Sequence, residues 1–182
     1  MPVVIPLVIL VIAGILLTSN FFAPWWVESQ LARYTSFNGS TFAAQISVKR
    51  TGTNNTSQLL FSIPVGANTM GPDTQYLLHC KEWRLDANII TIASWINMPS
   101  HTWYQLTQIE GSRCYNQHGK AIPAIDIKLP GSNDSFGEAV QNHEEVAGLV
   151  SAKDIASNFV QADGKTYNVT VSQNAIFLTA TS

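Results

Sequence analysis

The stretch Gln75–Trp95, which reads QYLLHCKEWRLDANIITIASW, carries the strongest pattern in the chain. From Trp83 to Ile89 apolar and polar side chains alternate strictly, as in a strand that has one face in a core and the other in water. From Ile89 to Ile92 the polar positions become apolar, so we expect this end to be covered on both faces or to lie against a partner. The sequence therefore predicts a long central strand.

The segments on both sides of this strand also have β-type patterns. Residues 43–50 and 58–63 flank the turn cluster at 51–55 and predict a β-hairpin. Beyond Trp95, the runs at 103–109 and 113–115 are separated by Glu110-Gly111-Ser112, which favours a turn. We therefore expect the central strand and these two runs to form a three-stranded meander.

The C-terminal part mixes helical and β-type signals. Ser135-Phe136-Gly137-Glu138 fits a capping box, and the apolar spacing that follows predicts a helix from Phe136 to Val146. Asp163-Gly164 predicts a tight hairpin between strands at 154–160 and 166–171, and residues 175–180 predict a last strand. The expected fold class is α+β: a mainly antiparallel, twisted sheet of about seven or eight strands with one packed helix.

The N-terminal residues predict a membrane anchor. Val3–Leu17 is apolar, and the rings of Phe21, Phe22, Trp25 and Trp26 follow it as an interfacial aromatic belt would. A cleaved signal peptide is the alternative, although the segment before the apolar run has no Lys or Arg. We expect a transmembrane helix in 1–27, a linker or stalk in 28–40, and a periplasmic β-rich domain in 41–182. The predicted location is the inner membrane, with a single pass and the C-terminal domain in the periplasm.

Composition narrows the classes of partner. The 182 residues are 46% hydrophobic and 12% charged, with a formal net charge of -2, so there is no basic field to bind nucleic acid. The length suits one domain with a core and an appendage. The sequence does not indicate an oligomeric state.

Three groups of residues are similar in order and spacing to a family of small single-anchor envelope proteins of γ-proteobacteria, which are often labelled as multidrug transporters. They are His79-x-x-Glu82-Trp83-x-Leu85-Asp86-Ala87 with Trp95, Tyr104-x-Leu106-x-x-Ile109-x-Gly111-x-x-x-Tyr115, and Asp163-Gly164-x-x-Tyr167-x-Val169-x-x-Ser172. The resemblance implies an N-terminal membrane segment and a periplasmic β-rich domain, and it brings no catalytic residues. A single apolar segment cannot enclose a transport path, so the transporter label does not fit.

Cys80 and Cys114 are the only cysteines, and they lie in strands that we expect to be neighbours. The simplest interpretation is a disulfide, formed in an oxidising compartment. A metal site that adds His79 and His118 is the alternative. Because consecutive strand residues point to opposite faces, His79 and Cys80 are poorly placed to bind one ion. We therefore predict no metal and no cofactor.

Catalysis has little support in the sequence. Arg84 and Asp86 share the solvent face of one strand and read as a surface ion pair, and Glu82 is expected to pair with Arg113 across the meander. No motif of a nucleophilic, phosphate-binding or zinc enzyme is present. We predict that the protein is not an enzyme.

Aromatic side chains are the remaining candidates for a site. Because Trp103 and Tyr104 are consecutive, one of them should face away from the core. The expected contact residues for a partner or ligand are Trp83, Trp95, Trp103, Tyr104 and Phe136. The leading hypothesis is a membrane-anchored periplasmic binding or accessory module that contacts another envelope protein through a sheet edge or aromatic face. The alternatives are a periplasmic carrier of a small hydrophobic ligand or lipid, and an envelope hydrolase with no identifiable nucleophile.

Overall fold

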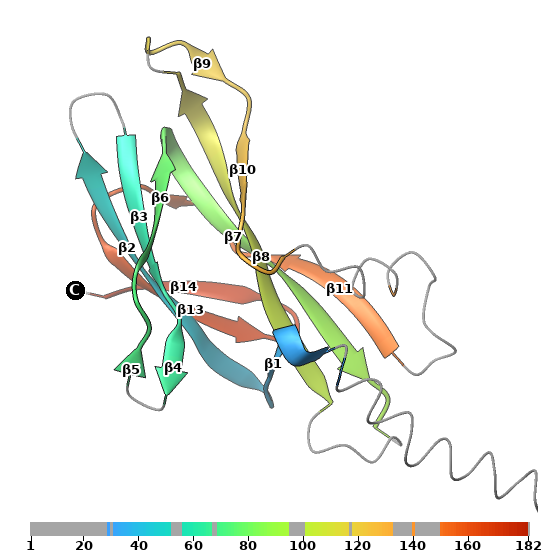
Figure 1. The fold of residues 1–182 in the computed structure, drawn as a ribbon. Helices are drawn as coiled ribbons and strands as arrows, with labels where there is room; N and C mark the ends of the chain where they lie inside the picture. Colours follow the sequence, from blue (N-terminus) through green and yellow to red (C-terminus); the bar gives the residue numbers. More distant parts are fainter. Residues whose placement is uncertain are drawn as a thin grey trace, which may run out of the picture.

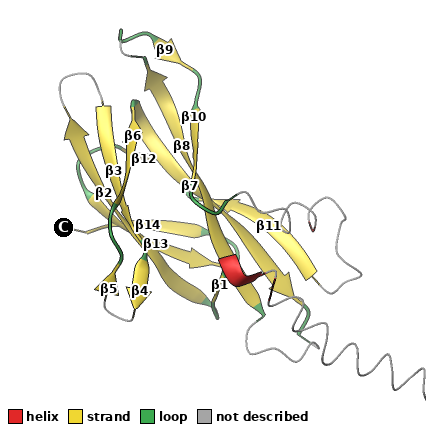
Figure 2. Ribbon diagram, viewed as in Figure 1, coloured by secondary structure: helices red, strands yellow, loops and turns green. Residues whose placement is uncertain are grey.

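A computed structural model describes residues 29, 31–51, 56–66, 69–94, 101–116, 118–132, 140 and 150–181. These residues form two β-sheets that face each other, with a small hairpin beside them (Figures 1 and 2). The first sheet has the order β1 (Thr35–Ser36), β8 (Thr102–Tyr115), β7 (Cys80–Ile92) and β11 (Val150–Ala156), with β9 (Ala121–Ile122) and β10 (Ile125–Lys128) on β8 and β12 (Val160–Gln161) on β7. The second has the order β14 (Ile176–Thr181), β13 (Thr166–Ser172), β2 (Ser40–Thr51), β3 (Thr56–Ser62) and β6 (Thr74–Leu78), and β4 (Pro64–Gly66) pairs with β5 (Thr69–Met70).

The predicted central strand is confirmed as β7, which pairs with β8 on one side and with β11 on the other. Trp83, Leu85, Ala87 and Ile89 face the core between the two sheets. The expectation that both faces are covered near Ile92 is also confirmed. On the outer face, Ile90 and Ile92 belong to a second buried cluster with Leu31, Tyr34, Trp103, Val140 and Val150.

The two sheets are joined along both long sides. The chain passes from β6 of the second sheet directly into β7 of the first through His79. On the opposite side, Ser157 forms a parallel bridge with Ile176 at the start of β14. The Ser157 backbone donates to Leu85 O at 2.8 Å, and its hydroxyl accepts from Leu85 N at 3.0 Å. Ser157 therefore ties β14 to the central strand.

The α+β expectation is wrong. The regular structure of the described residues is almost entirely β, apart from a short 3-10 turn, η2 (Leu31–Arg33). The helix expected from Phe136 to Val146 lies outside the described residues except for Val140, which is helical and buried. Alternating apolar positions on long strands supply the core, so the described fold is built by packing one sheet on another.

The structure does not support the predicted single-pass location in the inner membrane. Among the residues that the structure describes, no helix has both the length and the apolar character needed to cross a bilayer. The predicted anchor, residues 1–27, lies outside the described part of the chain.

Two turn signals were misleading. Glu110-Gly111-Ser112 does not turn, because β8 runs without interruption from Thr102 to Tyr115. Asp163-Gly164 does not close a hairpin either: the chain leaves β12 in the first sheet and enters β13 in the second. The hairpin that does form joins β13 to β14, with Ser172 N donating to Ala175 O at 2.9 Å. The predicted β2–β3 hairpin is confirmed.

Residues 31–40, expected as a linker or stalk, contact the first sheet. Thr35 and Ser36 pair with Tyr104 and Trp103. Leu31, Tyr34 and Phe37 are buried, and the Phe37 ring meets the Tyr104 ring edge to face at 5.7 Å. The described β-rich unit therefore begins at Leu31.

Candidate functional site

The two cysteines lie opposite each other in the ladder of β7 and β8 and form a disulfide, with their Cα atoms 3.9 Å apart. Gly111 lies against this bond: a Cβ added there would be 2.5 Å from Cys80 Sγ. Because both thiols are consumed, the alternative site with His79 and His118 is not formed. No group of three or more potential metal ligands occurs among the described residues.

Those of the predicted aromatic contact residues that the structure describes, Trp83, Trp103 and Tyr104, are buried. Trp83 is fully buried and meets the Tyr167 ring edge to face at 5.6 Å. Tyr104 belongs to the core between the sheets, and burial raises the pKa of its hydroxyl. Trp103 does face outward, as expected for one of the pair, but the chain's own Leu31 and Tyr34 share its buried cluster. The other residues predicted for a site or interface, Trp95, Phe136, Phe21, Phe22, Trp25 and Trp26, lie outside the described part of the chain.

The two ion pairs predicted from the sequence are present. Arg84 Nε lies 3.4 Å from Asp86 Oδ1, and Arg84 also pairs with Glu110 on β8. Arg113 Nη1 lies 3.1 Å from Glu82 Oε1. Arg113 has a φ of 54°, a backbone conformation that residues other than glycine rarely adopt. These pairs are partly exposed, so each contributes little to stability.

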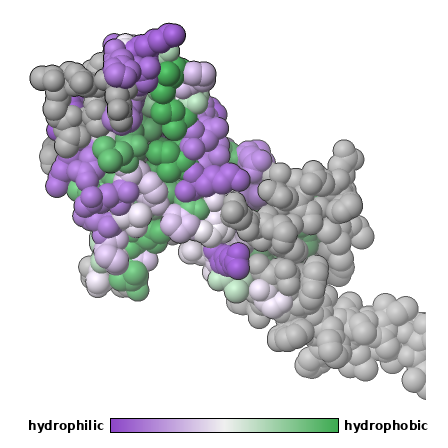
Figure 3. Space-filling view, turned by 45° about the horizontal axis from the view of Figure 1, so that its top comes forward, coloured by the Kyte–Doolittle hydropathy of each residue, from purple (hydrophilic) through white to green (hydrophobic). Residues whose placement is uncertain are grey.

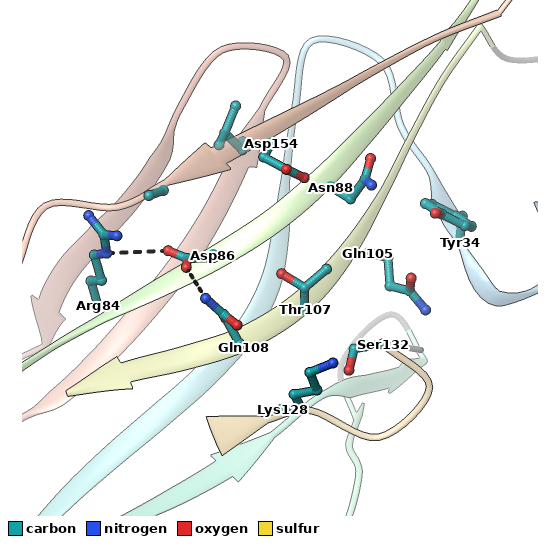
Figure 4. A pocket seen from close by; sticks show the side chains of 12 residues that line it. Tyr34, Arg84, Asp86, Asn88, Gln105, Thr107, Gln108, Lys128, Ser132 and Asp154 are labelled. Carbon is teal, nitrogen blue, oxygen red and sulfur yellow. Dashed lines mark hydrogen bonds and ion pairs between the residues drawn. The ribbon is translucent and has the colours of Figure 1, made fainter. Parts of the chain in front are cut away.

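A polar groove lies on the outer face of the first sheet, with a volume of about 370 Å³. Figure 4 shows that it extends from Arg84 at one end to Tyr34 at the other, with side chains of β7 and β8 on its floor. Lys128 on β10 and Asp154 on β11 line its sides. Four charged side chains line the groove, two of each sign: Arg84, Lys128, Asp86 and Asp154. Their formal charges cancel, so the groove does not favour an ion of either sign.

A β-bulge concentrates the polar groups of this groove. Asp86 pairs with Gln108, whereas the next residue, Ala87, pairs with Leu106, so Thr107 is the extra residue on β8. As a result Gln105, Thr107 and Gln108 all line the groove, although strict alternation would separate Gln105 from Gln108. Gln108 Nε2 donates to Asp86 Oδ2 at 2.7 Å, and Gln105 Nε2 donates to Gly131 O at 2.7 Å.

Asn88 is the notable residue on the groove floor. It is 8% exposed, and its Oδ1 has no hydrogen-bond partner among the described residues. An amide that is buried without a partner costs about 1–3 kcal/mol, so such groups are uncommon in folded proteins. The sequence contained a weak signal for Asn88, a lone amide between Ala87 and Ile89, but gave no sign of the bulge that assembles its neighbours.

The pKa values show a second polar contact, away from the groove. Tyr167 Oη donates to Asp163 Oδ1 at 3.0 Å, where the chain crosses from one sheet to the other. Burial, together with the bond to Asp163 and its charge, raises the pKa of Tyr167 to about 12. Burial opposes ionisation of Asp163, but hydrogen bonds from Lys165 and Tyr167 lower the pKa of this carboxyl overall. This contact ties Tyr167 on β13 to the crossover between the sheets.

Exposed hydrophobic side chains occur mainly on the second sheet and its hairpin. Ile63, Val65 and Met70 lie on or beside the β4–β5 hairpin, and Figure 3 shows hydrophobic surface at the lower left, where Figure 1 places it. Phe177 on β14 is 54% exposed and Phe42 on β2 is 41% exposed. Both pair with Thr170, so the two phenyl rings flank it in one row on the outer face. The sequence reasoning did not identify this row.

The fold and these surfaces define a class: a disulfide-linked, two-sheet β protein with a polar groove on one sheet and an open edge on the other. The chain matches no family model, no curated protein and no solved structure. The resemblance to single-anchor envelope proteins therefore stays a prediction.

Proposed function

We propose that this protein is a binding module that adds an extended segment of another protein to the free edge of β14. The observation that carries the proposal is the chemistry of this edge. β14 pairs with β13 on one side, and on the other its one bridge within the described residues is that between Ile176 and Ser157. From Phe177 to Thr181 the strand has no charged residue and no proline.

The backbone of β14 is oriented to accept another strand. Antiparallel pairs alternate between hydrogen-bonded and non-hydrogen-bonded positions. Ser172 and Ala175 form a hydrogen-bonded pair, because Ser172 N donates to Ala175 O. Counting three positions along the ladder, the pair of Val169 with Leu178 is a non-hydrogen-bonded pair. The N–H and C=O groups of Leu178 and Ala180 therefore point away from β13, where an added strand would meet them.

Natural sheets usually protect such an edge, and this protein does so elsewhere. β11, the edge of the first sheet, carries Lys153 and Asp154, both exposed. Charged side chains on an edge strand disfavour pairing with another chain. The strand β14 has no charged side chain and no proline to disfavour such pairing, which supports a role in binding.

The side chains beside the edge indicate the kind of segment that fits. An added strand would place every second side chain on the outer face, next to Phe177 and within the row that includes Thr170 and Phe42. The partner segment should therefore carry aromatic or β-branched residues at alternate positions and no charge opposite Phe177. Main-chain pairing gives the affinity in this mode, and the alternating side chains give the specificity.

The experiment uses a photo-crosslinking amino acid at Thr179 of the full-length chain in the producing cells. The matched control carries the same amino acid at the exposed Phe159, in the connection between β11 and β12. We expect one protein to be crosslinked by the amino acid at Thr179 and not by the amino acid at Phe159. That protein is then purified and its affinity measured against the wild type and two variants. Ala180→Pro removes one outward N–H and keeps the bonds to β13, which an edge strand tolerates, and Phe177→Ser removes one ring.

We expect each variant to bind the captured protein at least tenfold more weakly than the wild type. A tenfold loss corresponds to about 1.4 kcal/mol of binding free energy. Hydrogen exchange at the Leu178 and Ala180 amides should slow in the complex. Equal binding by the wild type and Ala180→Pro would contradict the proposal. So would capture of a second copy of this chain alone, which would make the edge a site of self-association.

A carrier of small hydrophobic molecules is supported less well. Trp83, named for such a site, is fully buried in the core. An apolar cavity does lie between the sheets, lined by Phe61, Tyr76 and Tyr104 among others, but its volume is about 170 Å³. Sites for drug-sized ligands are typically about 300–1,000 Å³, so this cavity is too small for a lipid. For a hydrolase, no nucleophile and base in contact can be named among the described residues.

A further inference from the structure

The polar groove on the first sheet requires an explanation that strand addition to β14 does not give. The groove and β14 belong to different sheets, and Asn88 lies on the groove floor with an amide oxygen that is buried and without a described partner. A ligand that donates a hydrogen bond to this oxygen would remove the cost of burying it. We propose that the groove binds a neutral saccharide, with the Asn88 amide as its central hydrogen-bonding group.

The charges in the groove do not favour an ionic ligand, because two cationic and two anionic side chains line it. Arg84 is paired with Asp86 and with Glu110, and Asp86 also accepts from Gln108. An ion that binds at Arg84 or Asp86 would have to break these contacts. The amide of Asn88, the amide oxygen of Gln105 and the hydroxyls of Thr107 and Ser132 remain, and together they offer both donors and acceptors. Hydroxyl groups of a sugar match such a set, because they too both donate and accept.

The floor of the groove also argues against a peptide. β7 is paired on both sides, with β8 and β11, and β8 is paired with β7 and β10. Apart from the bulge at Thr107, most of their main-chain groups in the groove are paired within the sheet and offer little to the amides of an extended peptide. A saccharide can be bound by side chains alone. The lining also includes Ala156 and the ring of Tyr34, which suit the C–H faces of sugar rings.

The volume sets the size of the ligand. At about 370 Å³ the groove falls within the range of small-molecule sites, toward its lower end. In Figure 4 Arg84 and Tyr34 lie at opposite ends of the lining side chains, with Asp154 and Lys128 on either side between them. This shape fits a short saccharide that lies along the strands, so disaccharides are the appropriate probes.

The test is a nuclear magnetic resonance titration of the isotope-labelled full-length chain with neutral disaccharides built from glucose, galactose, mannose and their N-acetylamino forms. We expect at least one of them to cause saturable shifts in the side-chain amide signals of Asn88 and Gln105. The variant Asn88→Leu should bind this disaccharide at least tenfold more weakly, while its midpoint of urea unfolding stays unchanged or rises because an unsatisfied amide is gone. The matched control is Gln75→Leu on β6 of the second sheet, which should bind like the wild type.

Three outcomes would overturn the proposal. One is that no disaccharide of the panel gives a saturable shift at millimolar concentration. Another is that Asn88→Leu binds as tightly as the wild type. The third is that a neutral peptide, added as a competing probe, shifts the Asn88 and Gln105 amides where the disaccharides do not.

Discussion

The substitution Gly111→Ala tests how the disulfide is packed in the core. The added Cβ would lie 2.5 Å from Cys80 Sγ, 2.8 Å from Leu78 Cδ1 and 3.2 Å from Cys114 Sγ. Ordinary contacts of this kind are about 3.5–4 Å long, so the sulfur must move by about 1 Å inside a buried cluster. Such overpacking costs about 2–3 kcal/mol, and the lower chain entropy of unfolded alanine returns about 0.5 kcal/mol. We expect a net loss of about 2 kcal/mol.

A double-mutant cycle separates the sulfur contact from the rest. In the background Cys80→Ala/Cys114→Ala the Sγ atoms are absent, and the end of the Leu78 side chain remains as the tight contact. The cost of Gly111→Ala should then fall to less than about 1 kcal/mol, which gives a coupling energy of at least about 1 kcal/mol. Urea unfolding followed by tryptophan fluorescence measures all four proteins, with Ser112→Ala as a neighbouring control. An equal cost in both backgrounds would refute the assignment of the clash to the disulfide.

Three further predictions concern stability. The pair Cys80→Ala/Cys114→Ala should lower the free energy of unfolding by about 4 kcal/mol through loop entropy, given a sequence separation of 34 residues; a loss below about 1 kcal/mol in urea would contradict this. Because the folded pKa of Tyr167 is about 12 and its ordinary value is 10, its contribution is complete below pH 10 and is lost as the pH rises through 12. This amounts to about 2–3 kcal/mol, so wild type and Tyr167→Phe should differ in pH dependence in that alkaline window. They should also differ in acid, because the bond from Tyr167 that helps to lower the pKa of Asp163 is lost. At Arg113, with its positive φ, Arg113→Gly should change stability by less than about 0.5 kcal/mol, whereas Arg113→Val should cost about 1–2 kcal/mol, and equal effects would argue against backbone strain.

The sequence predicted the strands well where one face is buried. The alternation from Trp83 to Ile89 identified the central strand, its polar face and its ion pair, because burial on one side imposes a period of two. It also predicted that consecutive aromatic residues would face opposite ways. What it could not predict was that Leu31 and Tyr34, far away in the chain, join the same buried cluster as the outward Trp103.

The errors arose where one residue type serves two structural purposes. Glycine in Glu110-Gly111-Ser112 reads as a turn, yet it lies in the middle of β8 because the disulfide leaves no space for a side chain. Gly164 does adopt a positive φ of 89°, as the Asp-Gly signal predicts, but it serves a crossover between sheets. Local sequence reports the backbone conformation of a turn and not which strands the turn connects.

Both proposed binding surfaces depend on features that alternation cannot encode. The groove requires the bulge at Thr107, which brings Gln105 and Gln108 to the same face. The open edge depends on strand order, which is a property of the whole sheet. In the sequence Asn88 is an ordinary member of the polar face of the alternating strand, and Phe177 is an aromatic ring in an apolar run, so neither stands out as a site residue.

Ser157 explains why the edge begins where it does. Its bridge to Ile176 and its two bonds to Leu85 close the side of the two-sheet structure. Beyond Ile176, β14 continues without this contact, so its outward backbone groups from Leu178 onward remain available for a partner. Leu85 is also the neighbour of Asp86 in the groove, which places the closed corner between the two proposed sites. Because Asn88→Leu and Ala180→Pro lie on opposite sides of that corner, each should abolish one kind of binding and leave the other intact.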